Sequence, residues 1–150
     1  NTIQHAGVVV GIAGTAGHVH YRYDKSNLGY MGRLYYAQNY SAVTAACMMM
    51  PAVVFDQVGG FDERFVVAYN DVDLCLRVRQ MDKLVVFTPF AELYHYESKT
   101  RGNDLDQANK ARFEQEQKLF RTIWKEFLNR GDPYFNPNFS LERENFFLKT

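Results

Sequence analysis

Residues 41–50 set the strictest condition on the fold, because they read Ser-Ala-Val-Thr-Ala-Ala-Cys-Met-Met-Met without a charge. Such a run predicts a strand that is buried on both faces, as in the interior of an α/β sheet. Pro51 follows at once and suits the first turn of a helix, which Gly59 and Gly60 would end. We therefore expect a covered strand followed directly by a short helix.

The rest of the chain alternates β-branched runs with helical periods. Leu74, Cys75, Val78 and Met81 repeat at helical spacing, and Asn70 is a suitable N-cap for that helix. The other predicted elements are a strand within residues 4–12 that runs into a Gly-rich loop, a loop or short helix over 21–40, short strands at 84–87 and 91–96, and a long amphipathic helix over 106–128. The aromatic, proline-containing tail should pack on the body as an ordered loop.

Alternating strands and helices predict an α/β fold, and 150 residues leave room for a single domain. The sheet would be thin, so its apolar strand needs further cover. Either the chain self-associates or a segment outside this sequence supplies the cover. Asn1 stands where a start methionine would be, directly before a strand-like run, so we expect a fragment of a longer protein.

Charge and composition exclude several classes of protein. Seventeen basic residues balance seventeen acidic ones, and no clustered basic patch indicates nucleic-acid binding. No apolar run reaches the ~20 residues of a membrane span, and no signal peptide is visible. Cys47 and Cys75 lie in apolar runs, so we expect two buried, reduced thiols and a cytoplasmic protein.

The segment Asn70-Asp71-Val72-Asp73 places two acids at a predicted helix start. Acids in a first turn favour the helix dipole, and Asp73 has the spacing to pair with Arg77. The chemical alternative is that Asp71 projects into a cleft and serves as a general base.

His95 ends a predicted short strand, and a polar, basic, Gly-terminated loop follows at residues 98–102. A lone histidine is usually structural, and most such loops are solvated, although some bind phosphate. A metal-dependent hydrolase built on Asp71, Asp73 and His95 would need more converging ligands. The remaining histidines form no convincing ligand set: His5, His18 and His20.

The order of several motifs resembles family 2 glycosyltransferases, especially those of bacterial O-antigen and other surface polysaccharides. The matching stretches are Gln4-His5-Ala6-Gly7, Ser41-Ala42-Val43-Thr44-Ala45-Ala46-Cys47, Val58-Gly59-Gly60-Phe61-Asp62-Glu63, Asn70-Asp71-Val72-Asp73-Leu74-Cys75-Leu76-Arg77, His95-Tyr96-Glu97-Ser98, Arg101-Gly102 and Asp132-Pro133-Tyr134-Phe135-Asn136-Pro137-Asn138.

The resemblance implies that residues 1–150 are the acceptor-side, C-terminal half of a GT-A (Rossmann-like) domain. This partial fold would have a small mixed sheet, flanking helices and a long C-terminal helix, and would lack the nucleotide-binding half with its DxD motif. Asp71 would be the catalytic base of an inverting sugar transfer. Asp62, Glu63 and Asn70 would bind the acceptor, although relatives often carry Glu where this chain has Asn70.

The same resemblance implies the remaining partners. Lys99 and Arg101 would bind the donor diphosphate, and His95 would be a ligand of a divalent metal, Mn or Mg, that also needs the missing half. The donor would be a nucleotide-diphosphate sugar, and the acceptor a saccharide or a lipid-linked saccharide. The protein would act in the cytoplasm, peripheral at the inner face of the membrane, and the fragment alone would be inactive. The alternative is a non-catalytic glycan- or protein-binding module derived from such an enzyme.

Overall fold

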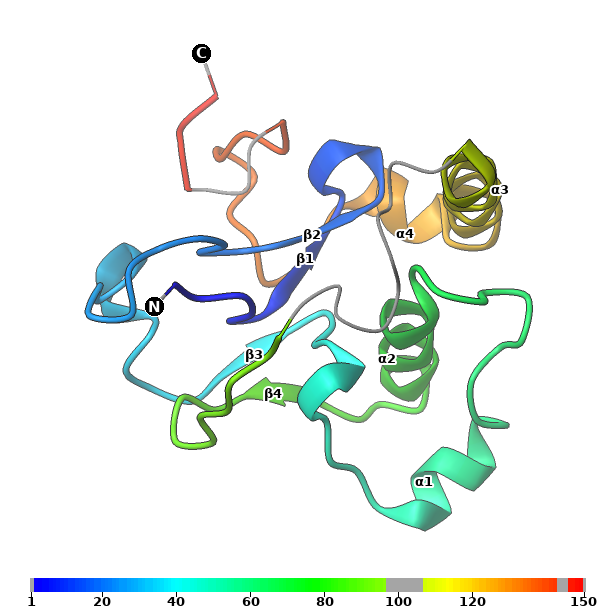
Figure 1. Cartoon of the computed structure of the whole chain (residues 1–150), viewed down its shortest axis with the longest axis horizontal. Coiled ribbons are helices and arrows are strands. Elements are labelled where there is room, and N and C mark those ends of the chain that lie inside the picture. The colour runs from blue at the N-terminus through cyan, green and yellow to red at the C-terminus, as the bar shows by residue number, and fades with distance from the viewer. Residues whose placement is uncertain (1, 97–106, 143–145, 150) are drawn as a thin grey trace.

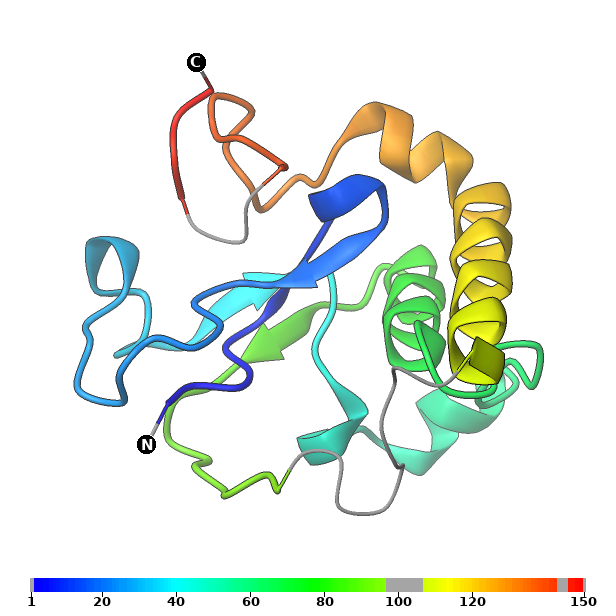
Figure 2. The ribbon, with the colours of Figure 1, turned by 45° about the horizontal axis from the view of Figure 1, so that its top comes forward.

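A computed structural model describes residues 2–96, 107–142 and 146–149 (Figure 1). The strands are β1 (Val8–Val10), β2 (Ala16–His18), β3 (Gln38–Tyr40) and β4 (Val85–Phe87). The helices are α1 (Ala52–Gln57), α2 (Asn70–Gln80), α3 (Gln107–Ile123) and α4 (Lys125–Arg130), with 3₁₀ turns η1 (Ile12–Gly14), η2 (Tyr30–Gly32) and η3 (Ala45–Cys47). In both ribbon views α2 and α3 lie on the same side of the strands (Figures 1 and 2).

The strands form two antiparallel pairs. β1 pairs with β2, and β3 pairs with β4. A single bridge joins the two pairs, because the Val8 N–H donates to the Ala42 carbonyl at 2.9 Å. The coarse α/β prediction of helices packed with a small sheet is confirmed. The predicted mixed sheet is wrong in its pairing, since every strand pair in the described ranges is antiparallel.

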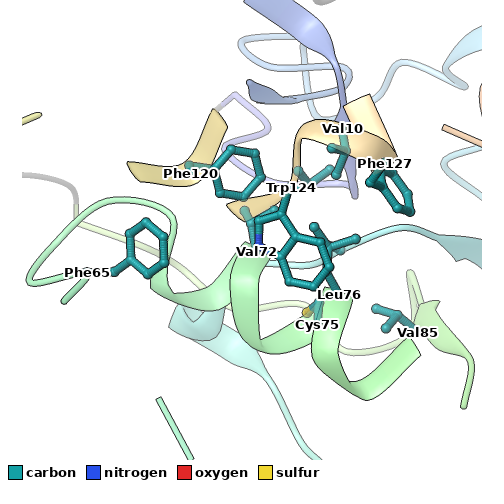
Figure 3. Packing of buried hydrophobic residues seen from close by; sticks show 11 residues of the cluster. Val10, Phe65, Val72, Cys75, Leu76, Val85, Phe120, Trp124 and Phe127 are labelled. Atoms are coloured by element: carbon teal, nitrogen blue, oxygen red, sulfur yellow. The ribbon is translucent and has the colours of Figure 1, made fainter. Parts of the chain in front are cut away.

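β1 is the strand that is buried on both faces. Its side chains alternate between two apolar clusters, with Val8 and Val10 in one and Val9 in the other. The larger cluster joins β1 to α2, α3 and α4 (Figure 3), and its members are Val8, Val10, Ala42, Phe65, Val72, Cys75, Leu76, Val85, Phe120, Trp124 and Phe127. β1 is therefore the centre of the core.

The predicted strand over residues 41–50 is wrong. β3 ends at Tyr40, and only Ser41 and Ala42 continue into the core. The Thr44 side chain then caps η3 and redirects the chain toward the surface, where Met49 is 98% exposed. The apolar run is thus only partly covered: Val43 and Met48 still pack against the core, whereas residues 45–47 and Met49 are exposed. Its Cys47 is exposed, which corrects the expectation of a buried thiol there.

Other predictions need correction as well. β2 lies in a segment predicted as a loop, and β3 in one predicted as a loop or short helix. Residues 91–96 are exposed and form no strand. The long helix is interrupted at Trp124, where φ is −101° and ψ is 22°, and it continues as α4. The residue before α2 is Tyr69, so Asn70 is its first residue and not the N-cap. The predicted helix after Pro51 and the strand at 85–87 are confirmed.

The C-terminal tail packs on the body as predicted, and Asp132 holds it there. The Asp132 carboxylate accepts hydrogen bonds from the Val10 N–H at 2.8 Å, the Ser41 hydroxyl at 2.7 Å and the Tyr134 N–H at 2.9 Å. Burial raises the pKa of Asp132, and these hydrogen bonds oppose that rise because they favour the carboxylate. One buried side chain thereby ties β1, the end of β3 and the tail together.

His20 makes stability sensitive to acid. It is fully buried and accepts a hydrogen bond from the Tyr30 N–H at 3.1 Å, and burial and then the charge of Arg33 lower its pKa from 6.5 to about 4. Since the unfolded chain binds a proton below pH 6.5 and the folded chain does not until about pH 4, this stability is complete above pH 6.5 and is lost as the pH falls toward 4.

We therefore expect the titration of His20 to lower the free energy of unfolding by about 2 kcal/mol when the pH is lowered from 7 to 5. Urea titrations at the two pH values measure this loss. His20→Gln keeps an acceptor for Tyr30 but does not titrate, so its loss should be smaller by about that amount. Equal losses in the two proteins would contradict the assignment.

Candidate functional site

The chain enters α2 through a strained residue. Tyr69 has φ of 64°, in the left-handed region that costs a bulky side chain on the order of 1–3 kcal/mol. Its ring stacks on Phe120 with centroids 4.9 Å apart, and its hydroxyl hydrogen-bonds to the Thr15 hydroxyl at 3.1 Å. These contacts hold the backbone that presents Asn70 and Asp71.

Asp71 is a partly exposed carboxylate whose two oxygens are both oriented. Its Oδ2 accepts the Ala45 N–H at 3.1 Å, and its Oδ1 accepts the Val72 N–H at 2.8 Å. The Asn70 side-chain oxygen accepts the Asp71 N–H at 2.8 Å. Since each carboxylate oxygen has two lone pairs, each keeps capacity for a further hydrogen bond. Asp71 can therefore receive a proton from a bound hydroxyl while it keeps its hydrogen bonds to the Ala45 and Val72 amides.

Asp73, two residues later, has the structural role. It is 1% exposed, with Oδ1 accepting the Trp124 indole N–H at 2.9 Å and Oδ2 accepting Arg77 Nε–H at 2.8 Å. The predicted ion pair with Arg77 is thus confirmed. Enclosure between Trp124 and Arg77 removes Asp73 from any hydrolase site shared with Asp71 and His95.

Asp62 and Glu63 lie in the loop between α1 and α2. Arg64 donates to the Asp62 carboxylate from Nε at 2.9 Å and from Nη2 at 2.6 Å, and these hydrogen bonds hold the pKa of Asp62 below its usual range. The Arg64 N–H also donates to Asp62 at 3.0 Å, which is the contact of a turn. Glu63 is exposed. The acceptor-binding role of both residues stays a prediction.

Glu116 is a residue of this region that sequence reasoning missed. From α3, where it is 3% exposed, its carboxylate accepts three consecutive backbone N–H groups, from Val66 at 2.7 Å, Val67 at 3.0 Å and Ala68 at 2.9 Å. These bonds fix the segment that leads into Tyr69. The sequence does contain one indication of this burial: Glu116 lies four residues before Phe120, and so on the same face of the helix as that apolar residue.

The predicted donor-binding and metal-binding residues lie in, or directly before, a segment outside the described residues. His95 is exposed, and Lys99 and Arg101 lie outside the described residues. Within residues 2–96, 107–142 and 146–149, no three His, Cys, Asp or Glu side chains are grouped to hold a metal ion. The role of His95 as a metal ligand stays a prediction, since the implied site also needs the half that carries the DxD motif.

Two shallow pockets of about 260 Å³ each are present, and Asp71 lines neither. The first lies between α3 and the loop that precedes α2, and the second is mainly aromatic. Their linings are Arg64, Val66, Arg112, Gln115, Glu116 and Leu119, and Tyr23, Asn27, Gly29, Tyr30, Phe146 and Phe147. Among the described helices, none has the length and apolar character to cross a membrane.

Comparison with known proteins gives three informative similarities. The chain is 48% identical over 149 residues to the uncharacterized protein y4gI of Sinorhizobium fredii, which covers 99% of this chain and 16% of that protein. It is 39% identical over 142 residues to the O-antigen biosynthesis protein RfbC of Myxococcus xanthus, covering 93% of this chain and 11% of RfbC. It is 37% identical over 62 residues to the N-acetylglucosaminyl-diphospho-decaprenol L-rhamnosyltransferase of Mycobacterium tuberculosis, covering 41% of this chain and 20% of that enzyme.

No protein-family model matches the chain, and no solved structure matches it. The chain spans a fifth or less of the length of these curated relatives. Two of the three carry names from polysaccharide synthesis or sugar transfer. The chain is thus similar to segments of proteins named for O-antigen biosynthesis and for rhamnosyl transfer.

Proposed function

We propose that this chain forms the acceptor side of an inverting, family 2 glycosyltransferase of the GT-A fold that acts in bacterial surface polysaccharide synthesis. The observation that carries the proposal is Asp71, a partly exposed carboxylate whose two oxygens are oriented by the Ala45 and Val72 amides. The strained Tyr69 beside it supports the proposal, since backbone strain clusters at functional sites. The printed names of two relatives point to the same chemistry.

The proposed reaction transfers one proton, forms one bond to the anomeric carbon and breaks another. Asp71 takes the proton of an acceptor hydroxyl while that oxygen forms a bond to the anomeric carbon of the donor sugar. The bond from the anomeric carbon to the diphosphate breaks, and its electron pair leaves with the nucleotide diphosphate. Attack from the face opposite the leaving group inverts the configuration. A positioned base contributes on the order of 10²–10⁴ to such a rate.

The other binding roles extend this proposal. Asn70, Asp62 and Glu63 would contact the acceptor, and Lys99 and Arg101 would neutralise charge on the leaving diphosphate. A divalent metal, with His95 as one ligand and further ligands from the missing half, would help to neutralise the same charge. The nucleotide-sugar donor, the saccharide or lipid-linked acceptor, and a place in the cytoplasm at the inner face of the membrane all stay predictions.

Self-association also stays a prediction, and the surface supports it. Among the described residues, β4 pairs with β3 on one side only, which leaves its other edge open. Large apolar side chains are exposed on β4, on the segment after it and near α1: Met49, Val53, Leu84, Val86, Phe90, Leu93, Tyr94 and Tyr96. Burying them against a second copy would remove this apolar area from water.

The experiment that tests the function is transfer by the complete polypeptide in which this sequence occurs. It would be supplied with a panel of nucleotide-diphosphate sugars and saccharide acceptors, and the anomeric configuration of the product would be read by NMR. A product with inverted configuration supports the proposal, and a retained configuration contradicts it. Saccharide binding without transfer of any sugar would favour the non-catalytic module.

A further inference from the structure

We propose that His5 is a positioning residue for Asp71, and that it acts through the backbone of residues 44–46. The kinetic consequence of this inference rests on the proposed function. The geometry itself does not, because it concerns only which acceptor each backbone amide uses.

Three consecutive amides enter η3, and each has its own acceptor. The Thr44 N–H points to His5 Nε2 at 3.4 Å, the Ala45 N–H donates to Asp71 Oδ2 at 3.1 Å, and the Ala46 N–H points to the Thr44 hydroxyl at 3.5 Å. His5 and Asp71 therefore hold adjacent peptide units. A displacement of the Thr44 amide also displaces the Ala45 amide, because successive peptide planes share an α-carbon.

The contacts of His5 specify its tautomer. Its Nε2 also faces the Gly7 N–H at 3.4 Å, so two donors share this nitrogen and it must carry no proton. The proton then lies on Nδ1, which donates to His18 Nδ1 at 3.0 Å. Burial, and after it the neighbouring His18, lower the pKa of His5 to about 3, which keeps the imidazole neutral. A neutral ring is required, because an imidazolium has no acceptor for Thr44.

The backbone on the His5 side is itself tightly constrained. Gly7 has φ of 107°, and a Cβ at this position would lie 2.4 Å from the Tyr40 ring. The His5 ring meets the Phe87 ring edge to face, with centroids 6.5 Å apart. The His5 ring is thus held between Phe87 of β4 and His18 of β2, and it can act as a fixed reference for the turn.

α2 holds the opposite side of the same segment. The Cys75 thiol donates to the Val43 carbonyl at 3.6 Å, and burial raises the pKa of that thiol to about 12, so it remains a donor. Residues 43–45 are therefore fastened to α2 by Cys75 and Asp71, and to the segment before β1 by His5. Without the His5 acceptor, Thr44 loses this hydrogen bond, and the next fixed point toward β1 is the Ala42 carbonyl, two residues earlier. A displacement of about 1 Å at a reacting group can cost on the order of 10²-fold in rate.

The test uses two matched variants in the complete polypeptide. His5→Gln can place an amide oxygen near the position of Nε2, whereas His5→Phe keeps a ring of similar size without an acceptor. We expect His5→Phe to lower kcat by about 10–100-fold with an unchanged KM for the donor, and His5→Gln to recover most of that loss. Near-wild-type kcat in His5→Phe overturns the inference. Equal impairment of both variants also overturns it, because it would assign the effect to packing.

A second measurement does not depend on activity or on a variant. Long-range ¹H–¹⁵N correlation NMR on the chain reports which ring nitrogen of His5 is protonated. Protonated Nδ1 and unprotonated Nε2 support the inference, and the reverse tautomer overturns it.

The Asp71→Asn variant separates the two proposals. If it transfers sugar normally, the proposed function fails while the tautomer result stands. If it is inactive while His5→Phe is fully active, only the positioning role of His5 fails.

Discussion

Replacing Asp71 by Asn is expected to lower kcat for sugar transfer by the complete polypeptide by about 10²–10⁴-fold. The amide has nearly the shape of the carboxylate, and its oxygen can still accept one of the two backbone N–H groups that orient Asp71. It cannot accept the proton of an acceptor hydroxyl, because an amide is not a base near neutral pH. The loss should therefore fall on the chemical step.

The measurement is kcat together with the dissociation constant for the donor, which we expect to stay close to the wild-type value. Asp56→Asn is a matched control, because it makes the same change on an exposed position of α1. It should leave transfer unchanged. Wild-type transfer by the Asp71→Asn variant would remove Asp71 from the role of base.

Replacing Asp73 by Ala should have the largest effect on stability, a loss of about 3–5 kcal/mol in the free energy of unfolding. The change deprives the Arg77 guanidinium of its carboxylate partner and leaves the Trp124 indole N–H without an acceptor. Arg77 would keep only a neutral partner, the Val58 carbonyl that accepts from Nη1 at 2.5 Å, and its Nη2 atom is already buried without one.

Urea unfolding measures the loss, and two further variants keep the test decisive if Asp73→Ala does not fold. Trp124→Phe keeps a large ring and removes only the indole donor, so it should cost about 1–3 kcal/mol. Asp71→Asn, two residues away on the same helix but partly exposed, should cost less than about 1 kcal/mol. A loss below that amount for Asp73→Ala would contradict its structural role.

The elements that sequence analysis predicted correctly are those governed by neighbours along the chain. Leu74 and Cys75 lie four and three residues before Val78, and α2 buries all three. Gly59 and Gly60 follow the short helix α1, as expected. The Asp73–Arg77 pair follows from its i,i+4 spacing. Such features need only the local geometry of a helix.

The misplaced strand shows where composition misleads. Residues 41–50 carry no charge and read as the centre of a sheet, yet the buried centre is β1, whose valines alternate between two clusters. Both runs are apolar, so hydrophobicity could not rank them. The ranking depends on which run meets α2, α3 and the tail, and these contacts join residues far apart in the sequence.

The candidate site divides in the same way. The sequence singled out the Asp71–Asp73 pair, but it could not say which acid was open. Trp124 decides this, because its indole N–H captures Asp73 from 51 residues away. Glu116 and His5 were missed as parts of the region for the same reason, since their partners lie 48–50 and 39 residues distant.

By itself, the sequence determined the local helices, the position of α2 and the presence of two acids at its start. These follow from periodicity, spacing and turn chemistry, which act over a few residues. Only the tertiary structure decided that residues 41–50 leave the core after Ala42 and are partly exposed, that Asp73 is enclosed, and that Asp71 shares a turn with His5. The reason is physical: burial and hydrogen bonding at these positions are supplied by segments that the folded chain brings together from 26 to 51 residues away.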